Sequence, residues 1–352
     1  MSTCPICQSN YADKKNVHFI PWFMIKKNVT LNGGGLRDTE LSFSIDSDLF
    51  TGAYQGRSVL PENVEALHES HNLRNDAFNH YSRDYLICSQ CESKMSRLES
   101  LFATAFADPI LQREFSSQAN DSENFVLFMP ERFHNSLFQL FVQSIFYRCS
   151  IARYNGFSLR PNVEKMISEN LRSSFATTDF RNLRAEHQIT LRHEFPIFAS
   201  YLNIDDNFDL TSLFITINHS YSPYFLLAGK WIFELFEKVG QIKASSERLY
   251  GVSQAFNHLS LYQNVSSVPN LFLLNQEVSE GIIKNVFDYF LERKMTGILK
   301  TIRVLHYRIF QRKGTEELYE RVRQSYLTHF SNHEGELNSM INAFSDVFGG
   351  RN

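Results

Sequence analysis

Apolar residues recur at helical spacing over two stretches in the middle of the chain. In residues 130–154 they fall four positions apart, and Pro130 is a favourable first residue for a helix. Residues 161–175 repeat the pattern after Pro161. The positions expected to face inward are Phe133, Leu137, Phe141, Ile145 and Cys149 in the first stretch, and Val163, Met166, Ile167 and Leu171 in the second. The pattern predicts two amphipathic helices.

Other parts of the chain carry shorter signals. Residues 85–88 are typical of a short strand that leads into a helix ending near residue 106. The apolar positions of that helix are Met95, Leu98, Phe102, Ala105 and Phe106. Residues 213–217 are typical of a strand, whereas residues 224–236 fit either a strand or a buried helix. From about residue 277 to the end the pattern is helical again.

The N-terminal region is interrupted by a polar stretch. Residues 17–23 suit a short strand that ends at Pro21, because proline cannot donate to a sheet. Residues 30–80 are polar, show little periodicity, and are predicted to be a long insertion. The run Gly33-Gly34-Gly35 lacks the preceding strand and the Lys-Ser/Thr of a phosphate-binding loop, so we expect a flexible loop.

The change in pattern after residue 108 predicts an α+β chain of two domains. Residues 1–108 would form a small domain that contains the insertion, and residues 109–352 a larger, mainly α-helical domain. The hydrophobic content of 43% and charged content of 21% are typical of folded globular proteins. The chain shows no secretory signal and no run of ~20 apolar residues, so we expect a cytoplasmic protein without a membrane partner. A net charge of −3 excludes a uniformly basic nucleic-acid coat but permits a local basic groove.

Four of the five cysteines form two Cys-x-x-Cys pairs, Cys4 with Cys7 and Cys88 with Cys91. Two such pairs offer four thiolates to one tetrahedral ion, which predicts a closed structural zinc site. Bringing the pairs together closes a long loop at a cost of roughly 4 kcal/mol, whereas structural zinc contributes about 10–16 kcal/mol. The alternatives are a redox dithiol, which needs only one pair, or unrelated buried thiols. The fifth cysteine, Cys149, is predicted to be a small core residue.

The order of these motifs resembles the zinc-stapled branch of the HNH (ββα-metal) endonucleases, which have a treble-clef fold. The motifs are Cys4-x-x-Cys7, then His18 in the run His-Phe-Ile-Pro, then Cys88-x-x-Cys91 followed by Glu92 and a helix. The resemblance covers residues 1–106. It implies a metal-dependent nuclease that hydrolyses phosphodiester bonds in DNA or RNA. Such an architecture would suit a bacterial defence effector, which is an association and not chemistry.

The resemblance also implies roles for three side chains. His18 would be the general base that takes a proton from the attacking water. Glu92 would hold a catalytic Mg²⁺ or Mn²⁺, and Glu99, one heptad later on the helix, would add a second oxygen. Each residue also has a structural interpretation. His18 can be a histidine hydrogen-bonded beside the zinc cluster, Glu92 an acidic residue favourable in the first turn of a helix, and Glu99 a solvated helix residue.

Two positions depart from the family pattern. Val17 stands where many HNH enzymes carry an acidic metal ligand, and Glu92 stands where Asn or His is frequent. Either one ligand set has replaced another, or the site has lost its catalytic metal and kept the zinc fold. Two functions therefore stay open. One is a nuclease, and the other is a non-catalytic zinc adaptor that binds nucleic acid or a partner protein.

Residues 298–313 bear on the choice of partner. Leu299, Ile302, Leu305 and Ile309 form an apolar stripe, and the other faces carry basic residues: Lys300, Arg303, Arg308, Arg312 and Lys313. Such a helix can follow a phosphate backbone, or it can be an ordinary solvated surface helix. The apolar positions of the helical domain are also suitable for contacts with a partner protein or with a second copy of the chain.

Overall fold

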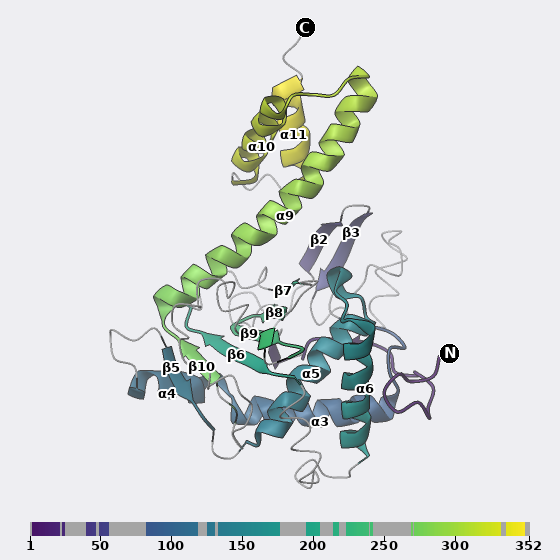
Figure 1. Cartoon of the computed structure of the whole chain (residues 1–352), viewed down its shortest axis with the longest axis vertical. Helices are drawn as coiled ribbons and strands as arrows, with labels where there is room; N and C mark the ends of the chain where they lie inside the picture. Colours follow the sequence, from purple (N-terminus) through teal and green to yellow (C-terminus); the bar gives the residue numbers. More distant parts are fainter. Residues whose placement is uncertain are drawn as a thin grey trace. The chain divides into compact units, whose positions relative to one another are not determined.

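The computed structural model describes residues 2–21, 23–24, 40–46, 49–55, 82–118, 125–130, 133–176, 195–204, 214–217, 223–238, 240–241, 269, 271–331 and 336–348. The chain divides into two compact units, and each is described by itself below. The first unit is formed by Met1–Leu41 and Tyr54–Ile282, and the second by Ser42–Ala53 and Ile283–Asn352. Helices and strands are both present, which confirms the mixed α+β class (Figure 1).

The N-terminal segment contributes two short strands and a helix. Strand β1 (Val17–His18) pairs antiparallel with β4 (Ser82–Arg83). Helix α3 (Ser89–Ala105) follows six residues after β4. Its buried face contains Cys91, Met95, Leu98 and Phe102. The predicted apolar face of this helix is therefore confirmed, and its end lies one residue before the predicted Phe106.

The strand predicted at residues 85–88 is wrong. Tyr85 has a φ of 60°, in the left-handed region, and the chain turns there. The Tyr85 amide donates to the Lys14 carbonyl at 2.7 Å, and the Lys14 amide donates to the Ile87 carbonyl at 3.2 Å. These two hydrogen bonds to the N-terminal segment satisfy the backbone groups of the turn without a regular strand ladder. The local sequence cannot reveal them, because the partner residue lies far away in the chain.

Helix α5 (Asn135–Ile151) is the centre of the first unit. It follows α4 (Asp108–Gln118) and β5 (Phe125–Phe128). Every residue of α5 up to Ser150 is buried, so the amphipathic helix predicted from residues 130–154 is in fact buried all round. Its sequence contains one charged residue, Arg148, and such a composition is typical of a core helix.

Helix α6 (Pro161–Phe175) has the bounds that the sequence predicts, with Pro161 in its first turn. The short helix η4 (Tyr154–Gly156) precedes it. The predicted inward positions Val163, Ile167 and Leu171 are buried, but Met166 is 37% exposed, which corrects its assignment to the inner face.

A six-stranded sheet completes the first unit, in the order β5-β10-β6-β9-β8-β7. Its other strands are β6 (Ile197–Leu202), β7 (Phe214–Ile217), β8 (Tyr224–Ala228), β9 (Trp231–Leu235) and β10 (Leu271–Leu274). Strands β10 and β6 are parallel, and the other neighbours are antiparallel. The strand predicted at residues 213–217 is confirmed. The ambiguous residues 224–236 form a hairpin, because Gly229 with a φ of 59° permits the tight turn between β8 and β9.

One face of this sheet packs against α3 and α5 through aromatic rings. The ring centroid of Phe102 lies 3.8 Å from the ring centroid of Phe141 and 5.1 Å from the ring centroid of Trp231. The same core contains Cys4, Ile6 and Val17 from the N-terminal segment, together with Leu273 from β10. One continuous core therefore includes residues on both sides of position 108.

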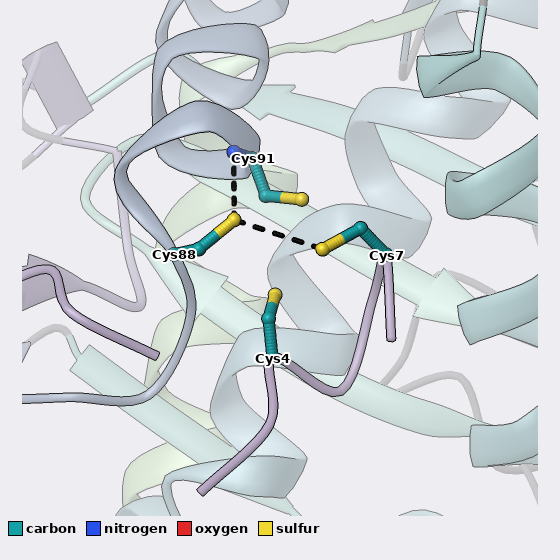
Figure 2. A group of neighbouring side chains, drawn as sticks. All are labelled: Cys4, Cys7, Cys88 and Cys91. Atoms are coloured by element: carbon teal, nitrogen blue, oxygen red, sulfur yellow. Dashed lines mark hydrogen bonds between the residues drawn. The ribbon is translucent and has the colours of Figure 1, made fainter. Parts of the chain in front are cut away.

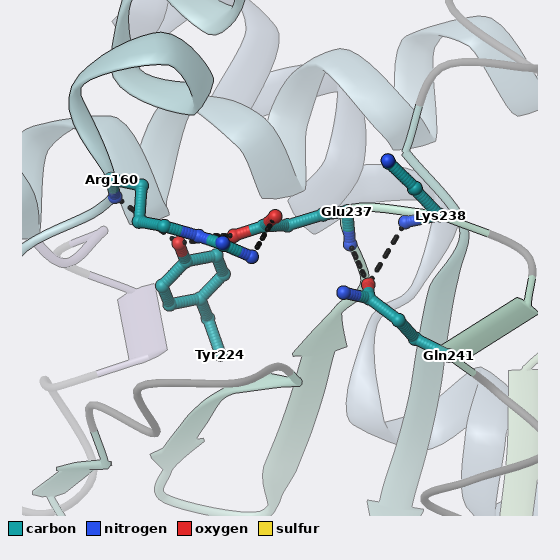
Figure 3. A network of polar contacts seen from close by, with 5 residues as sticks. All are labelled: Arg160, Tyr224, Glu237, Lys238 and Gln241. Atoms are coloured by element: carbon teal, nitrogen blue, oxygen red, sulfur yellow. Dashed lines mark hydrogen bonds and ion pairs between the residues drawn. The ribbon is translucent and has the colours of Figure 1, made fainter.

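A polar network joins the start of α6 to the end of β9 (Figure 3). The guanidinium of Arg160 binds the carboxylate of Glu237 through both oxygens, with 2.6 Å between Nε and Oε1. The Tyr224 hydroxyl donates to the same Oε1 at 2.7 Å and accepts from the Arg160 amide at 3.1 Å. Gln241 accepts from the amides of Glu237 and Lys238. The Arg160 guanidinium, the Glu237 carboxylate and the Tyr224 hydroxyl bind one another, so we interpret the network as structural.

The second unit is largely helical, as predicted for the C-terminal residues. It contains most of α9 (Gln276–Phe310), with α10 (Glu316–Ser331) and α11 (Glu336–Phe348). Its buried core residues are Met295, Ile302, Tyr319, Val322, Tyr326 and Ala343. None of the described helices has the length and the apolar run that a bilayer span requires.

The second unit also contains most of a two-stranded sheet of β2 (Glu40–Asp46) and β3 (Leu49–Gln55). These strands lie in the predicted insertion, where the sequence analysis expected little regular structure. The signal is present in β2, since Leu41, Phe43 and Ile45 alternate with serines at the period of a strand. The predicted loop at Gly33-Gly34-Gly35 lies outside the described residues.

Candidate metal centre

The first cysteine pair lies in a tight loop. An isolated bridge between Thr3 and Tyr11 closes this loop. Inside it, the Cys4 amide donates to the Asn10 carbonyl at 2.8 Å, and the Gln8 amide donates to the Cys4 carbonyl at 2.9 Å. Gln8 adopts a φ of 57°, which lets the chain reverse directly after Cys7. Both sulfurs therefore face the same side of a short, hydrogen-bonded turn.

The second pair opens helix α3. Cys88 is the N-cap residue, and its sulfur accepts from the Cys91 amide at 3.4 Å. Cys91 lies in the first helical turn, and the Glu92 amide donates to the Cys88 carbonyl at 3.0 Å. The Cys91 amide thus favours negative charge on the Cys88 sulfur, although burial raises the pKa of that thiol overall.

The structure brings the two predicted pairs together (Figure 2). All four sulfur atoms lie within 4.8 Å of one another, and those of Cys7 and Cys88 are 3.8 Å apart. A tetrahedral zinc ion with bonds of about 2.3 Å would place its sulfurs about 3.8 Å apart. None of the four forms a disulfide. Four cysteines at this spacing can hold one metal ion, which supports the zinc prediction at that level.

The charge of the cluster is also compatible with a bound cation. The thiol of Cys91 donates a hydrogen bond to Cys4, which lowers the pKa of Cys4 to about 4 and raises the pKa of Cys91. Burial raises the pKa of Cys88 as well. These opposite shifts mean that the cluster accommodates the first negative charge readily and resists the next ones. A divalent cation would remove that resistance, because a coordinated thiol loses its proton.

Helix α6 holds the first cysteine loop in place. The Ser168 hydroxyl donates to the Pro5 carbonyl at 2.8 Å, and Nε of Arg172 donates to the Ile6 carbonyl at 2.8 Å. The sequence analysis did not identify either residue. Both contacts join positions more than 160 residues apart, for which no local pattern exists.

His18 lies on β1 and is half-buried. Burial lowers its pKa to about 4, and the positive charges of Arg148 and Lys14 act in the same direction. The imidazole is therefore neutral at neutral pH. Its backbone carbonyl accepts a hydrogen bond of 2.7 Å from Nη1 of Arg148.

The two carboxylates predicted to hold a catalytic metal have different surroundings. Glu92 is half-buried, and its Oε2 has no hydrogen-bond partner within the described part of the chain. Burial raises the pKa of Glu92, while Arg148 opposes that rise. Glu99 is bound already, since its Oε1 lies 2.6 Å from Nη2 of Arg148. That contact is an ion pair whose angles are not those of a hydrogen bond.

Arg148 is the residue that the sequence analysis missed at this site. Its side chain is 1% exposed and reaches from α5 to Glu99 on α3 and to the His18 carbonyl on β1. A third contact joins its Nε to the Ser144 carbonyl at 3.3 Å. One feature of the sequence does point to Arg148, because it is the one charged residue in a helix of 17 residues.

Within the described ranges, the four cysteines are the one cluster of three or more Cys, His, Asp or Glu side chains with ligand atoms close enough for a shared ion. His18, Glu92 and Glu99 do not belong to such a cluster. The general base at His18 and the Mg²⁺ or Mn²⁺ held by Glu92 and Glu99 therefore stay predictions. The histidines of the insertion, His68 and His71, lie outside the described residues.

Comparisons with known proteins add no assignment. No protein-family model, no curated protein and no solved structure matches the chain. The likeness to HNH endonucleases therefore depends on the motifs in residues 1–106.

Proposed function

We propose that the chain is a non-catalytic, zinc-stapled binding protein. Residues 1–106 would form a diverged HNH-like, treble-clef module that binds one structural zinc through Cys4, Cys7, Cys88 and Cys91. The observation that supports the proposal most strongly is the guanidinium of Arg148, which is 1% exposed and bound to Glu99 and to the His18 carbonyl. A permanent positive charge thus lies among the groups that would have to form the binding site of a catalytic cation.

The chemistry of Arg148 explains why this arrangement disfavours a second metal. A guanidinium stays protonated at any physiological pH, so Arg148 cannot yield its charge to an incoming Mg²⁺. Glu99 is engaged as the counter-charge of Arg148, and removing one partner of a buried ion pair costs about 3–5 kcal/mol. A hard divalent ion would also need several oxygen ligands. Of the two carboxylates, Glu92 has a buried oxygen with neither a hydrogen bond nor an ion pair among the described residues, whereas Glu99 Oε1 is paired with Arg148.

The zinc would have a structural role in this proposal. The N-terminal loop is held to the first unit by the contacts of Ser168 and Arg172 and by the buried residues Cys4 and Ile6. One ion joined to Cys88 and Cys91 would fix the same loop to the start of α3. Its binding free energy would then contribute directly to folding.

A cleavage assay tests the proposal. Purified, zinc-loaded wild-type protein and the His18→Ala variant would be incubated with plasmid DNA and with structured RNA, in Mg²⁺ or in Mn²⁺. We expect no cutting above the level seen with a chelator. Metal-dependent cutting by the wild type that disappears in a His18→Ala variant with its zinc intact would overturn the proposal.

A nuclease is the second candidate, and one observation favours it. The buried Oε2 of Glu92 has no hydrogen-bond partner among the described residues, and the neutral imidazole of His18 is influenced by the same Arg148 charge as Glu92. A cation bound by Glu92 would satisfy that oxygen and could activate water for His18. Arg148 would have to leave Glu99 for such a site to form, and the assay above separates the two functions.

A further inference from the structure

The end of helix α9 carries a concentration of positive charge. We use "basic segment" for residues 300–313, which contain Lys300, Arg303, Arg308, Arg312 and Lys313 and no acidic residue. The whole chain has a formal charge of −3, so without these five cations the remainder would carry −8. Such asymmetry in an otherwise acidic chain is typical of a surface for a polyanion.

The same segment exposes large apolar side chains. Five of the ten large hydrophobic residues that are exposed in the described part of the chain lie here. They are Val304 (48%), Leu305 (38%), Tyr307 (52%), Ile309 (59%) and Phe310 (41%). Single exposed apolar residues are ordinary, but a concentration on two helical turns indicates an interaction surface.

The inner side of the segment is fixed by packing. Ile302 and His306 are buried, and Nδ1 of His306 lies 3.4 Å from the hydroxyl of Tyr319 on α10. The His306 ring also contacts Phe348 on α11, with 5.0 Å between ring centroids. The exposed side chains are therefore presented on a helix that is already held in place.

Most of the cations of the basic segment, which includes the last turns of α9 and the three residues after it, are available to a ligand. Arg303 is engaged, since it binds Glu316 at 2.7 Å and lies over the Tyr319 ring. The remaining four are exposed, and none makes an ion pair with another described residue: Lys300, Arg308, Arg312 and Lys313. The nearest carboxylates in sequence are Glu316 and Glu317, at the start of α10, and the first of these is neutralised by Arg303.

We infer that the basic segment binds a single-stranded polynucleotide. Lys300, Arg308, Arg312 and Lys313 contact its phosphates, and the exposed rings of Tyr307 and Phe310 stack on its unpaired bases. Mixed cations and aromatic rings are the features by which proteins hold single strands. The inference rests on the proposed binding function and names the partner.

The distribution of the apolar residues argues against a membrane surface. At 100° per residue, Val304 and Tyr307 lie on the side of α9 opposite Ile302, whereas Ile309 lies beside Ile302. Basic and apolar side chains thus alternate around the helix. An interfacial membrane helix needs one continuous apolar face, and the buried Ile302 and His306 already occupy the inner side.

Fluorescence anisotropy tests the inference on the full-length, zinc-loaded protein. The probes are labelled single-stranded DNA and single-stranded RNA of about 16 nucleotides, near the upper site size of one binding fold. The test variant is Arg308→Ala/Arg312→Ala/Lys313→Ala. The matched control, Arg113→Ala/Lys165→Ala/Arg321→Ala, removes the same charge from exposed positions elsewhere. Circular dichroism checks that both variants keep the helical content of the wild type.

We expect the test variant to bind at least about tenfold more weakly than the wild type and the control to bind like the wild type. Losing three phosphate contacts should also lower the slope of log K against log salt by about 2 for a single strand. Equal losses in the two variants would mean non-specific charge attraction and would overturn the inference. So would unchanged binding in the test variant, or no binding of either probe.

A second variant separates stacking from charge. Tyr307→Leu keeps an apolar side chain but removes the ring, so we expect about fivefold weaker binding of single strands with unchanged binding of a duplex of the same sequence. An equal effect on both would contradict stacking by Tyr307.

Binding of the wild type and of the triple variant to vesicles that contain phosphatidylserine is measured as well. Binding to vesicles that the triple variant loses, without binding to either oligonucleotide, would assign the basic segment to membranes and overturn the inference. That result would leave the proposed function in place, because it changes neither the zinc site nor the absence of cleavage. Cleavage dependent on His18 would instead overturn the proposed function, whatever the anisotropy shows.

Discussion

At the scale of single residues, two buried charged groups of the first unit are in contrasting situations. Arg148 is 1% exposed and has partners in Glu99, the His18 carbonyl and the Ser144 carbonyl. Glu234 on β9 is 2% exposed, and its Oε2 has no partner within the described residues. Its cross-strand neighbours are aromatic, Phe198 on β6 and Phe225 on β8. The first group is stable as an ion, and the second is stable only when protonated.

Replacing Arg148 should destabilise the fold by leaving the charge of Glu99 unpaired. We expect Arg148→Met to lower the free energy of unfolding by about 3–5 kcal/mol, because Glu99 would stay half-buried without its counter-charge. Adding Glu99→Gln should restore a large part of that loss, since both charges are then gone. Urea unfolding of the single and double variants measures this, with exposed Lys165→Met as the control. Equal stability of the single and double variants would show that the pair is not coupled.

Glu234 should make stability fall as the pH rises. Burial raises its pKa to about 8 in the folded protein, whereas the unfolded chain should titrate near about 4.3. The folded state therefore binds more protons between these values, and stability decreases from about pH 4.3 to about pH 8 by up to 1.4 kcal/mol per pH unit.

The neutral variant Glu234→Gln lacks this titration. We expect it to match the wild type at pH 4 and to be more stable by about 3 kcal/mol at pH 7. Thermal or urea unfolding over this pH range measures the difference, and exposed Glu317→Gln serves as the control. Parallel pH profiles for the wild type and Glu234→Gln would contradict the assignment of a neutral buried carboxyl.

At the scale of elements, the metal centre connects a loop of the N-terminal segment to the first turn of α3. The loop is closed by the bridge between Thr3 and Tyr11 and held to α6 by Ser168 and Arg172. The Cys91 amide at the start of the helix donates to the Cys88 sulfur, which favours negative charge there. Metal binding by the four cysteines would therefore be coupled to the packing of these elements.

Loss of one cysteine ligand should release the zinc. We expect one zinc per chain in the wild type, none or a weakly held ion in Cys7→Ala, and a lower melting temperature for that variant. Cys7 is half-buried, so its replacement costs little packing and isolates the effect of the metal. Metal analysis and thermal unfolding measure both quantities. Cys149→Ala is the control, and a similar loss of zinc in that variant would contradict the four-cysteine site.

How much of these elements the sequence predicts depends on where their partners lie. Helix α6 was predicted with its observed bounds, because Pro161 marks its start and its apolar spacing is local. Helix α5 was predicted to be amphipathic but is buried all round, since the sheet that covers it comes later in the chain. The four cysteines were predicted as one cluster from their paired spacing, and the structure brings them together. Arg148 was missed because two of its partners, Glu99 and His18, lie more than forty residues away in the sequence.

At the scale of the whole molecule, the two units differ in their interiors and in their surfaces. The first has an extensive aromatic core that continues to the cysteine cluster. The second, in its described residues, has a smaller core that includes Ile302, Val322 and Tyr326, and it presents the basic segment. In our account the first unit is a zinc-stabilised scaffold, and the second carries the contact for a polyanion.

In the function that we propose, Arg148 stands in place of a catalytic cation, so that the zinc-loaded chain holds no second divalent ion. Electron paramagnetic resonance of Mn²⁺ added to the zinc-loaded protein tests this directly, because free Mn²⁺ gives a strong signal that binding diminishes. We predict that all added Mn²⁺ stays free at concentrations up to that of the protein. Binding of one Mn²⁺ per chain that is lost in Glu92→Gln, with the zinc retained, would contradict the account and favour the nuclease.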